Sequence, residues 1–531
     1  MSGEAVFARK ASGLVREAGL LDTSMLSIAM GACTVSAWYY TSTAPFLFPG
    51  ANHLLTYIIG AILGIAGWSF MWGILGGSMP RSGGDYVINS RIIHPIIGLG
   101  ESMANTFSAV IWTVLGATWV IDPGLRMLIG ATKIPPEAIG WCISPSGMFV
   151  LATIINITGF IIVMFGLRKY LFVQRVMMFW GLIATAMAAI IFMATPHAKF
   201  VEIWNYYAEQ YNSISWDTLL TRVQQEFPIP AGWNWTSTIG CLLPLSWGMI
   251  YIYVLVFIGG EVKNPRRNMF LSSIIATLVT VFFMGWVALS LGRMVGRDGW
   301  HALSYLELVG VEGYNFPFPP SYPVLASMVT HFNRFVGLFI GLGFMFQLYL
   351  ICICEYVLVS RVWFAWGMDC AGPTWFTDIH PRFASPIKLL SLLFILSEAG
   401  IILYVIRPAI LAGFSVEVLQ LVSVFLITSI SCTIFPYRKR VKDIWEASPY
   451  KHWKVGPIPY ATIAGLLSMV FVLICIWANF YTAGMAALNI VWTPIYIGVW
   501  IFGILWYYIW KWHRKKQGID ITLAYRELAP E

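Results

Sequence analysis

Residues 244–268, PLSWGMIYIYVLVFIGGEVKNPRRN, form an apolar run that ends in a basic cluster. The apolar part is long enough to cross a bilayer as a helix, and Pro265 cannot continue that helix because it lacks an N–H group. The basic cluster favours the cytoplasmic side of a membrane. Ser246–Gly248 interrupts the run near its middle, and irregular backbone at membrane depth is tolerated only where it lines a cavity or is buried in protein. The stretch predicts either a span whose interruption forms a binding site or an ordinary span with one tolerated glycine.

The composition of the whole chain is that of an integral membrane protein. Of its 531 residues, 58% are hydrophobic and 11% charged, and the mean hydropathy is +0.73. A soluble domain carries about 25% charged residues. The net charge of +8 therefore does not indicate nucleic-acid binding. The eight cysteines show no paired C-x-x-C spacing and the eight histidines are scattered, so we expect no metal site, no cofactor and no catalytic residues.

Twelve apolar segments are long enough to cross a bilayer, at about 20 residues each. They cover about 22–44, 53–77, 96–120, 148–165, 172–193, 239–260, 272–291, 335–360, 389–406, 416–435, 461–481 and 490–510. If both termini are cytoplasmic, the inner segments hold 25 of the 33 Lys and Arg residues. The bias of positive charge toward the cytoplasm then predicts twelve spans in the cell membrane with both termini inside.

Spans 1 and 6 occupy corresponding positions, five helices apart. Small residues interrupt both, at Gly31–Thr34 and at Ser246–Gly248. Such a pair of interrupted spans points to a transporter built from an inverted repeat, with its binding site near the midplane. The expected division is a cytoplasmic arm (1–21), a first repeat (22–194), an extracellular loop with short surface helices (195–238), a second repeat (239–435), two accessory spans (436–510) and a cytoplasmic tail (511–531).

Three polar stretches carry a family resemblance. Met79–Val87 (MPRSGGDYV), Gly260–Asn268 (GEVKNPRRN) and Ser360–Ala365 (SRVWFA), the last followed by His380–Phe383 and Pro386, are similar to loops of amino acid–polyamine–organocation (APC) permeases. They follow spans 2, 6 and 8, as in that superfamily. The resemblance covers about residues 13–509 and implies an all-α, LeuT-like fold with a 5+5 inverted repeat and broken helices 1 and 6.

The resemblance also implies where an amino acid binds. Its carboxylate would meet backbone N–H groups around Cys33, Thr34 and Val35, because a helix N-terminus attracts anions. Its ammonium would meet carbonyls near Ala29, Met30 and Ser246, beside Gly31. Side-chain candidates for the pocket are Trp247, Ile250 and Tyr251 beside Gly248, with Phe107 on span 3 and Phe346 on span 8. Packing between spans is the alternative role for each of these aromatic residues.

The sequence departs from its relatives in two ways. Span 1 lacks their Gly-x-Gly-Ile run, so the break can lie a residue away from its expected place. After Gly248 no acid follows until Glu261, which argues against a cationic substrate held by a helix-6 carboxylate.

Ion coupling is left open by the sequence. A lysine present on helix 5 of some proton-coupled relatives is replaced here by Gly181, and residues 335–359 contain no Ser or Thr for a sodium site. Glu355 and Glu101 lie within spans, where a carboxylate is a functional hypothesis by default. Each is a candidate for proton coupling, and for each an interfacial or paired carboxylate is the alternative.

The sequence thus predicts a secondary transporter, with no chemical step, that moves an amino acid by alternating access as a proton-coupled symporter or as an exchanging antiporter. A neutral, hydrophobic amino acid is favoured over a cationic amino acid or polyamine. The alternatives are a membrane-embedded sensor that binds an amino acid without turnover and an intramembrane enzyme. The expected partners are the amino acid, protons and the lipid bilayer, with no nucleic acid; the oligomeric state stays open.

Overall fold

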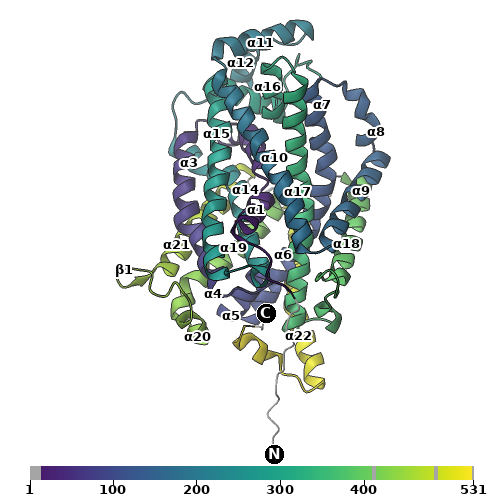
Figure 1. Ribbon diagram of the computed structural model, residues 1–531. Helices are drawn as coiled ribbons and strands as arrows, with labels where there is room; N and C mark the ends of the chain where they lie inside the picture. Colours follow the sequence, from purple (N-terminus) through teal and green to yellow (C-terminus); the bar gives the residue numbers. More distant parts are fainter. Residues whose placement is uncertain (1–13, 409–413, 484–487, 529–531) are drawn as a thin grey trace, which may run out of the picture.

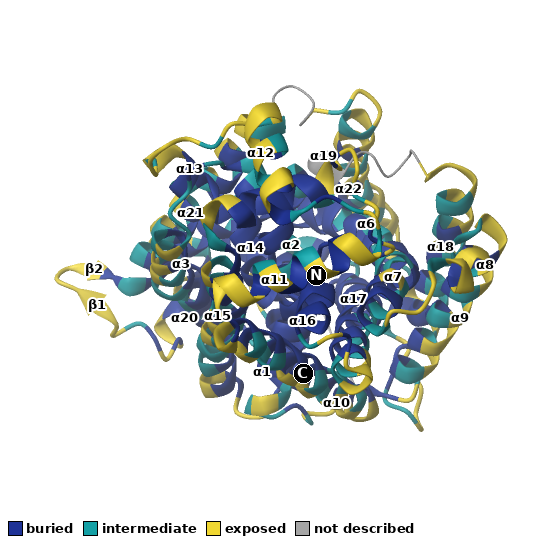
Figure 2. Cartoon of the chain, turned by 90° about the horizontal axis from the view of Figure 1, so that it is seen from above, coloured by how far each residue is buried: buried dark blue, intermediate teal, exposed yellow. Residues whose placement is uncertain are grey.

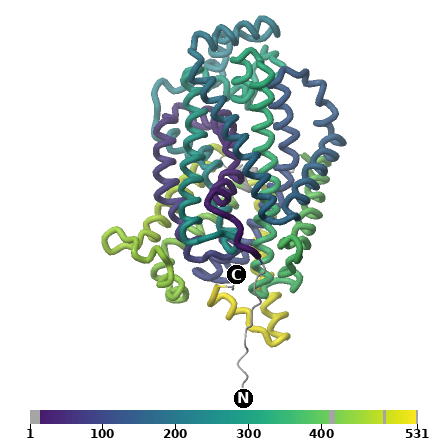
Figure 3. The backbone as a smooth tube through the Cα atoms, in the orientation of Figure 1, coloured from purple at the N-terminus to yellow at the C-terminus, as the bar shows by residue number. Residues whose placement is uncertain are grey.

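The computed structural model describes residues 14–408, 414–483 and 488–528 of the chain. Residues 1–13 of the predicted N-terminal arm and 529–531 of the predicted tail lie outside this part. Long helices run between two ends of the molecule (Figure 1), and the backbone trace in Figure 3 follows them in the same view. We call the end that carries α5 (Gly84–Ile92), α20 (Lys442–Glu446) and the C-terminal helix η11 (Ile521–Arg526) the terminal end. The far end carries α11 (His197–Gln210), α12 (Trp216–Glu226) and α16 (Tyr322–Val329).

Among the described residues, twelve helical segments are long and apolar enough to cross a membrane, so the predicted all-α fold with twelve spans is confirmed. In chain order the spans are α1 (Leu20–Met30) with α2 (Cys33–Leu47); α3 (His53–Ile62), η1 (Leu63–Ser69) and α4 (Phe70–Ser78); α6 (Pro95–Trp119), η2 (Val120–Leu125) and α7 (Arg126–Thr132); α9 (Pro145–Met164); α10 (Leu167–Ala194); α13 (Trp235–Gly240), α14 (Leu242–Ile250) and η4 (Tyr251–Phe257); α15 (Pro265–Leu308); α17 (Arg334–Met368); α18 (Ile387–Ile406); α19 (Phe414–Ile434) with η8 (Phe435–Tyr437); α21 (Tyr460–Ala483); and α22 (Trp492–Lys516).

Short elements connect the spans. They are α5 (Gly84–Ile92), η3 (Pro136–Ile139), α8 (Gly140–Ile143), α11 (His197–Gln210), α12 (Trp216–Glu226), η5 (Gly259–Glu261), α16 (Tyr322–Val329), η6 (Thr374–Thr377), η9 (Lys439–Val441), α20 (Lys442–Glu446), η11 (Ile521–Arg526) and the antiparallel strands β1 (Lys454–Val455) and β2 (Ile458–Pro459). The inverted repeat and the limits of its two halves stay a prediction.

The helices at the centre of the bundle are the most buried. Figure 2 shows buried residues around α2, α14, α16 and α17 and exposed residues at the periphery. Large apolar side chains project from the peripheral helices, among them Ile154 on α9, Ile183 on α10 and Ile395 on α18. Apolar side chains on the outside of a bundle suit contact with lipid, where every backbone polar group must be satisfied within the helices.

The first span is interrupted at Gly31 and Ala32. α1 ends at Met30 and α2 begins at Cys33, and Ala32 between them has φ 42° and ψ 62°. A left-handed conformation costs an L-residue roughly 1–2 kcal/mol, so the surrounding structure must hold it in place. Ser36 helps to stabilise this conformation, since its Oγ donates a hydrogen bond to the carbonyl oxygen of Gly31 at 2.5 Å.

The sixth span differs from the prediction. Ser246–Gly248 lie inside the regular helix α14, and the geometry changes to a 3-10 helix at Tyr251. The predicted position of the interruption is therefore wrong. The hydroxyl of Ser246 donates to the carbonyl of Leu243 at 2.6 Å, so it is satisfied within the helix. Gly248 allows close packing instead, because a Cβ there would collide with Met284 and Thr280.

Candidate functional site

A cavity of about 360 Å³ lies at the interruption of the first span. The end of α1, the interruption and the start of α2 form one wall, and α6, α14, η4, α17 and α18 contribute the others. It is lined by Met30, Gly31, Ala32, Val35, Ser36, Trp38, Tyr39, Trp112, Leu115, Trp119, Trp247, Tyr251, Ile351, Tyr404 and Pro408. Its size lies within the range of about 300–1,000 Å³ found for small-molecule pockets.

Aromatic rings in edge-to-face contact dominate the cavity. The Trp247 ring lies between those of Tyr39 and Trp112, with centroid distances of 5.2 and 5.4 Å. The Trp112 ring also contacts Trp119 at 5.8 Å and Tyr251 at 6.0 Å. Such pairs add about 0.5–1.5 kcal/mol each beyond the burial of area and fix the ring orientations. The cavity therefore has rigid, apolar walls.

The polar groups at the cavity are hydroxyl, indole N–H and backbone groups, and none of the fifteen described lining residues is charged. One lining residue is tied to a carboxylate: Trp38 Nε1 donates a hydrogen bond to Glu307 at 2.7 Å. Glu307 also accepts from Ser42 at 2.6 Å and from Ser321. Its oxygens are thus engaged by hydroxyl and indole donors.

The structure brings five of the predicted site residues to the cavity wall: Met30, Gly31, Val35, Trp247 and Tyr251. Six others are buried close by without lining it: Ala29, Cys33, Thr34, Ser246, Gly248 and Ile250. The Thr34 hydroxyl points toward α10, where it lies 2.8 Å from Thr185 Oγ1. The carbonyl of Ala29 accepts the N–H of Ala32 at 3.0 Å and is therefore already engaged.

Two predicted pocket residues lie elsewhere. Phe107 packs edge-to-face against Tyr496 of α22, with centroids 5.6 Å apart, and Phe346 packs against Trp180 of α10 at 5.5 Å. Neither lines the cavity. α6 and α17 do contribute to the wall, but through other residues, and the roles of Phe107 and Phe346 stay predictions.

The residues that the sequence analysis missed include one face of α6. Leu115 follows Trp112 by three residues and Trp119 follows Leu115 by four, so the three side chains lie on one side of the α-helix. This large apolar stripe is the signal that could have identified them. Trp38 and Tyr39 on α2 also line the cavity, and they follow the cluster of small residues that marks the interruption.

Two buried carboxylates lie near the terminal end. Asp85 Oδ2 accepts a hydrogen bond from Asn105 at 3.2 Å, and Glu101 Oε1 accepts one from Asn89 at 2.6 Å. Both side chains are 0% exposed, and neither pairs with a Lys or Arg in the part of the chain that the structure describes. Burial raises the pKa of Asp85 to about 7, against the hydrogen bonds from Asn105 and the Tyr86 N–H, which lower it.

The other coupling candidate, Glu355, is 1% exposed on α17 and does not line the cavity. Protein encloses its side chain, and its role in coupling stays a prediction. Arg361, six residues further along the same helix, pairs with Glu261.

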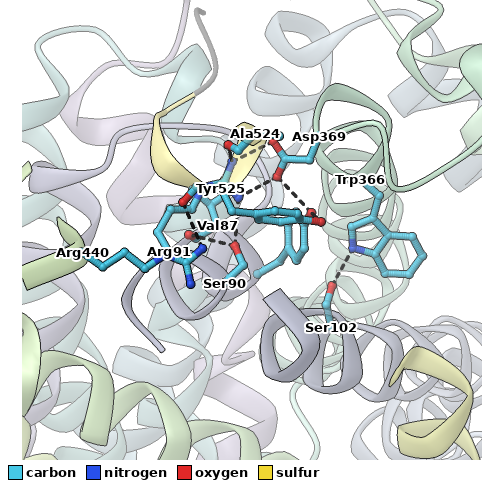
Figure 4. Close-up of polar contacts among 10 residues, drawn as sticks. Val87, Ser90, Arg91, Ser102, Trp366, Asp369, Arg440, Ala524 and Tyr525 are labelled. Carbon is cyan, nitrogen blue, oxygen red and sulfur yellow. Dashed lines mark hydrogen bonds and ion pairs between the residues drawn. The ribbon is translucent and has the colours of Figure 1, made fainter. Parts of the chain in front are cut away.

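Two bidentate ion pairs close the terminal end. Arg361 binds Glu261 through N–O distances of 2.9 and 3.1 Å, and Arg91 binds Asp369 through distances of 2.6 and 2.7 Å. All four side chains are at most 2% exposed. Tyr525 joins the second pair from the C-terminal segment (Figure 4).

The chain also pairs with itself beside Glu261. The N–H groups of Glu17 and Ala18 both donate to the carbonyl of Glu261, at 2.9 and 3.0 Å, and Lys263 N–H donates to the carbonyl of Ala18 at 2.8 Å. An ion pair and a short backbone ladder thus join the segment before α1, η5 and α17 at the terminal end.

No group of three or more His, Cys, Asp or Glu side chains arranged to hold a metal ion occurs among the described residues.

These features define a class: a polytopic membrane protein whose first span is interrupted at a cavity lined, in the described part of the chain, by aromatic and apolar residues. The amino acid permease family model matches residues 22–505, and the chain belongs to that family, within the APC superfamily. A comparison with curated proteins finds no match. Together with the twelve spans, the family makes this chain a multi-pass membrane transporter of amino acids.

Proposed function

We propose that the protein moves a neutral amino acid with an apolar or aromatic side chain across the cell membrane by alternating access, and that the cavity at Gly31 is its binding site. The observation that carries this proposal is the composition of the cavity wall, which is aromatic and apolar and, among the described residues, includes no charged side chain. A cationic side chain or a polyamine would lose its hydration there and find no charged partner among these described lining residues, which is costly. An apolar side chain gains from the same burial.

The charged ends of the substrate fit the interruption of the first span. The first N–H groups of α2, at Cys33–Val35, have no intrahelical partner and lie at the positive end of the helix dipole, which suits the carboxylate. The carbonyl groups at the end of α1, around Met30, suit the ammonium. The aromatic cluster around Trp247 then contacts the substrate side chain.

The two ends of the molecule support alternating access. The cavity extends to Tyr404 and Pro408, at the end of α18, while the ion pairs Arg361–Glu261 and Arg91–Asp369 close the terminal end. With both termini cytoplasmic, this arrangement is an outward-facing state with a closed cytoplasmic gate. Rocking of the two repeats, 22–194 and 239–435, would open that gate.

The buried carboxylates Asp85 and Glu101 are the groups we assign to proton coupling. They lie on α5 and α6 at the terminal end and have no cationic partner among the described residues. The pKa of Asp85, raised by burial to about 7, lets it exchange a proton at physiological pH. Ionisation would place an unpaired charge beside Glu101 and favour opening of the gate.

Uptake of radiolabelled leucine, phenylalanine, arginine and putrescine into proteoliposomes tests the function. We expect uptake of the two neutral amino acids, a strong loss in Trp112→Leu, and near-normal uptake in Phe107→Leu, which changes the same helix on a face away from the cavity. Uptake of arginine or putrescine instead would overturn the proposed substrate class. Binding of leucine without accumulation under any gradient would support the sensor.

A further inference from the structure

Five arginine side chains surround a second cavity, of about 860 Å³, at the terminal end. They are Arg16, Arg81, Arg266, Arg267 and Arg526. Two carboxylates, Asp443 and Glu527, lie among the lining residues. Five arginines against two carboxylates give the lining of this cavity an excess of positive charge.

The arginines come from four separate parts of the chain. Arg16 precedes α1, Arg81 precedes α5, Arg266 and Arg267 are in the first turn of α15, and Arg526 ends η11. In the part of the chain that the structure describes, no acidic side chain forms an ion pair with Arg16, Arg266, Arg267 or Arg526. Guanidinium groups brought together in this way repel one another unless an anion lies between them.

The backbone adds to the positive potential. Asn264 is the N-cap of α15 and Pro265 its first residue, and both line the cavity. The N-terminus of α15, whose first helical part runs from Pro265 to the kink at Gly296, thus lies at the hollow and attracts negative charge. A planar guanidinium fork matches two oxygens of a phosphate group, which makes arginine the preferred partner of phosphate.

We propose that this cavity binds a phosphate-bearing anion, either a soluble phosphate compound or the headgroup of an anionic lipid. Its occupancy also has a consequence for the gate. Arg16 is one residue before Glu17, which bonds the backbone of Glu261, and Arg526 follows Tyr525, which contacts Tyr86. An anion that holds these arginines together stabilises the closed terminal end and slows transport.

Binding can be measured apart from transport. Inorganic pyrophosphate is titrated into the purified full-length protein in detergent, and retention of phosphatidic acid against phosphatidylcholine is measured by native mass spectrometry. The test variant is Arg266→Gln/Arg267→Gln. The matched control is Lys515→Gln/Lys516→Gln, which removes two exposed positive charges at the end of α22, outside the cavity.

We expect the test variant to bind at least about tenfold more weakly than the wild type and the control to bind normally, since the variant removes two guanidinium groups that would form charge-assisted hydrogen bonds with the phosphate. Selective loss of pyrophosphate binding identifies a soluble anion, and selective loss of phosphatidic acid a lipid headgroup. Absence of binding in the wild type, or equal weakening in both variants, overturns the site.

Uptake measured with and without the bound anion then tests the effect on the gate. An unchanged uptake rate refutes the effect on the gate but not the binding site.

Discussion

The backbones of Gly31 and Gly248 touch, so that a Cβ built on Gly31 would lie 2.5 Å from the carbonyl oxygen of Gly248. The two glycines belong to the first and sixth spans, which are far apart in the sequence. Because the atom opposite Gly31 is part of the backbone, it cannot move aside as a side chain can. The contact fixes the interruption of the first span against α14 and so positions one wall of the cavity.

The first prediction concerns this contact. Gly31→Ala should separate α1 from α14 and lower neutral amino acid uptake by at least about tenfold, since misplacement of a binding group by 1 Å can cost a hundredfold. The measurement is initial uptake rate, normalised to the amount of folded protein in the liposomes. Gly498→Ala is the control, because a Cβ at that spanning position meets nothing within 4 Å. Normal uptake by Gly31→Ala would show that the close approach is dispensable.

The second prediction separates residues that line the cavity from those beside it. Trp247→Ala should raise the KM for phenylalanine by about tenfold or more, since buried aromatic anchors dominate binding energy. Ile250→Ala removes a side chain that is 4% exposed but does not line the cavity, so it should lower stability with little change in KM. Equal changes in KM would mean that the site extends around the helix to Ile250.

The third prediction concerns pH. The folded-state pKa of Asp85 is raised to about 7 from an unfolded value near 4, so the folded protein binds the extra proton between these pH values. The contribution of this group to stability therefore falls as pH rises from about 4 to 7, by up to roughly 4 kcal/mol, and then levels off. Asp85→Asn should remove this dependence.

Thermal unfolding of the detergent-solubilised protein between pH 5 and 8 measures the effect. The Tm of Asp85→Asn minus that of the wild type should grow with pH, and the pH dependence of uptake near 7 should flatten. Asp378→Asn, which alters an exposed pair with Lys388, is the control. A Tm difference that stays constant across this range would contradict the account.

The fourth prediction concerns the ion pair between Arg361 and Glu261. Glu261→Gln leaves a buried guanidinium without its partner and should destabilise the fold by about 3–5 kcal/mol. The double variant Glu261→Gln/Arg361→Met removes both charges and should recover much of the lost Tm. Asp122→Asn breaks an exposed pair with Arg126 and should cost at most about 1 kcal/mol. Additive losses in the double variant would show that the two side chains act independently.

Much of the fold followed from the sequence because long apolar runs and the placement of Lys and Arg are strong signals for a membrane protein. The interruption at Gly31 was found from a cluster of small residues. The interruption predicted at Ser246–Gly248 was misplaced because a glycine in a span can either break the helix or allow another helix to pack closely. Gly248 does the second, within a regular helix.

The site was predicted only in part for a physical reason: sequence spacing shows which residues share a helix face but not which way that face turns. Phe107 and Trp112 are both on α6, yet only Trp112 meets Trp247. Asp85 resembled an ordinary turn residue, since its burial depends on contacts with α6. The pairing of Arg91 with Asp369 joins residues 278 positions apart and has no local signal.

The most direct test of the central claim is protection of the cavity by substrate. Val35→Cys introduces a thiol at the cavity wall, in a background where the half-buried Cys142 and Cys370 are replaced by serine. The rate of labelling by a small methanethiosulfonate reagent is measured with and without saturating leucine, phenylalanine or arginine. The account predicts that leucine and phenylalanine slow the labelling and that arginine does not. Unchanged labelling under conditions in which the same protein accumulates leucine would place the binding site elsewhere.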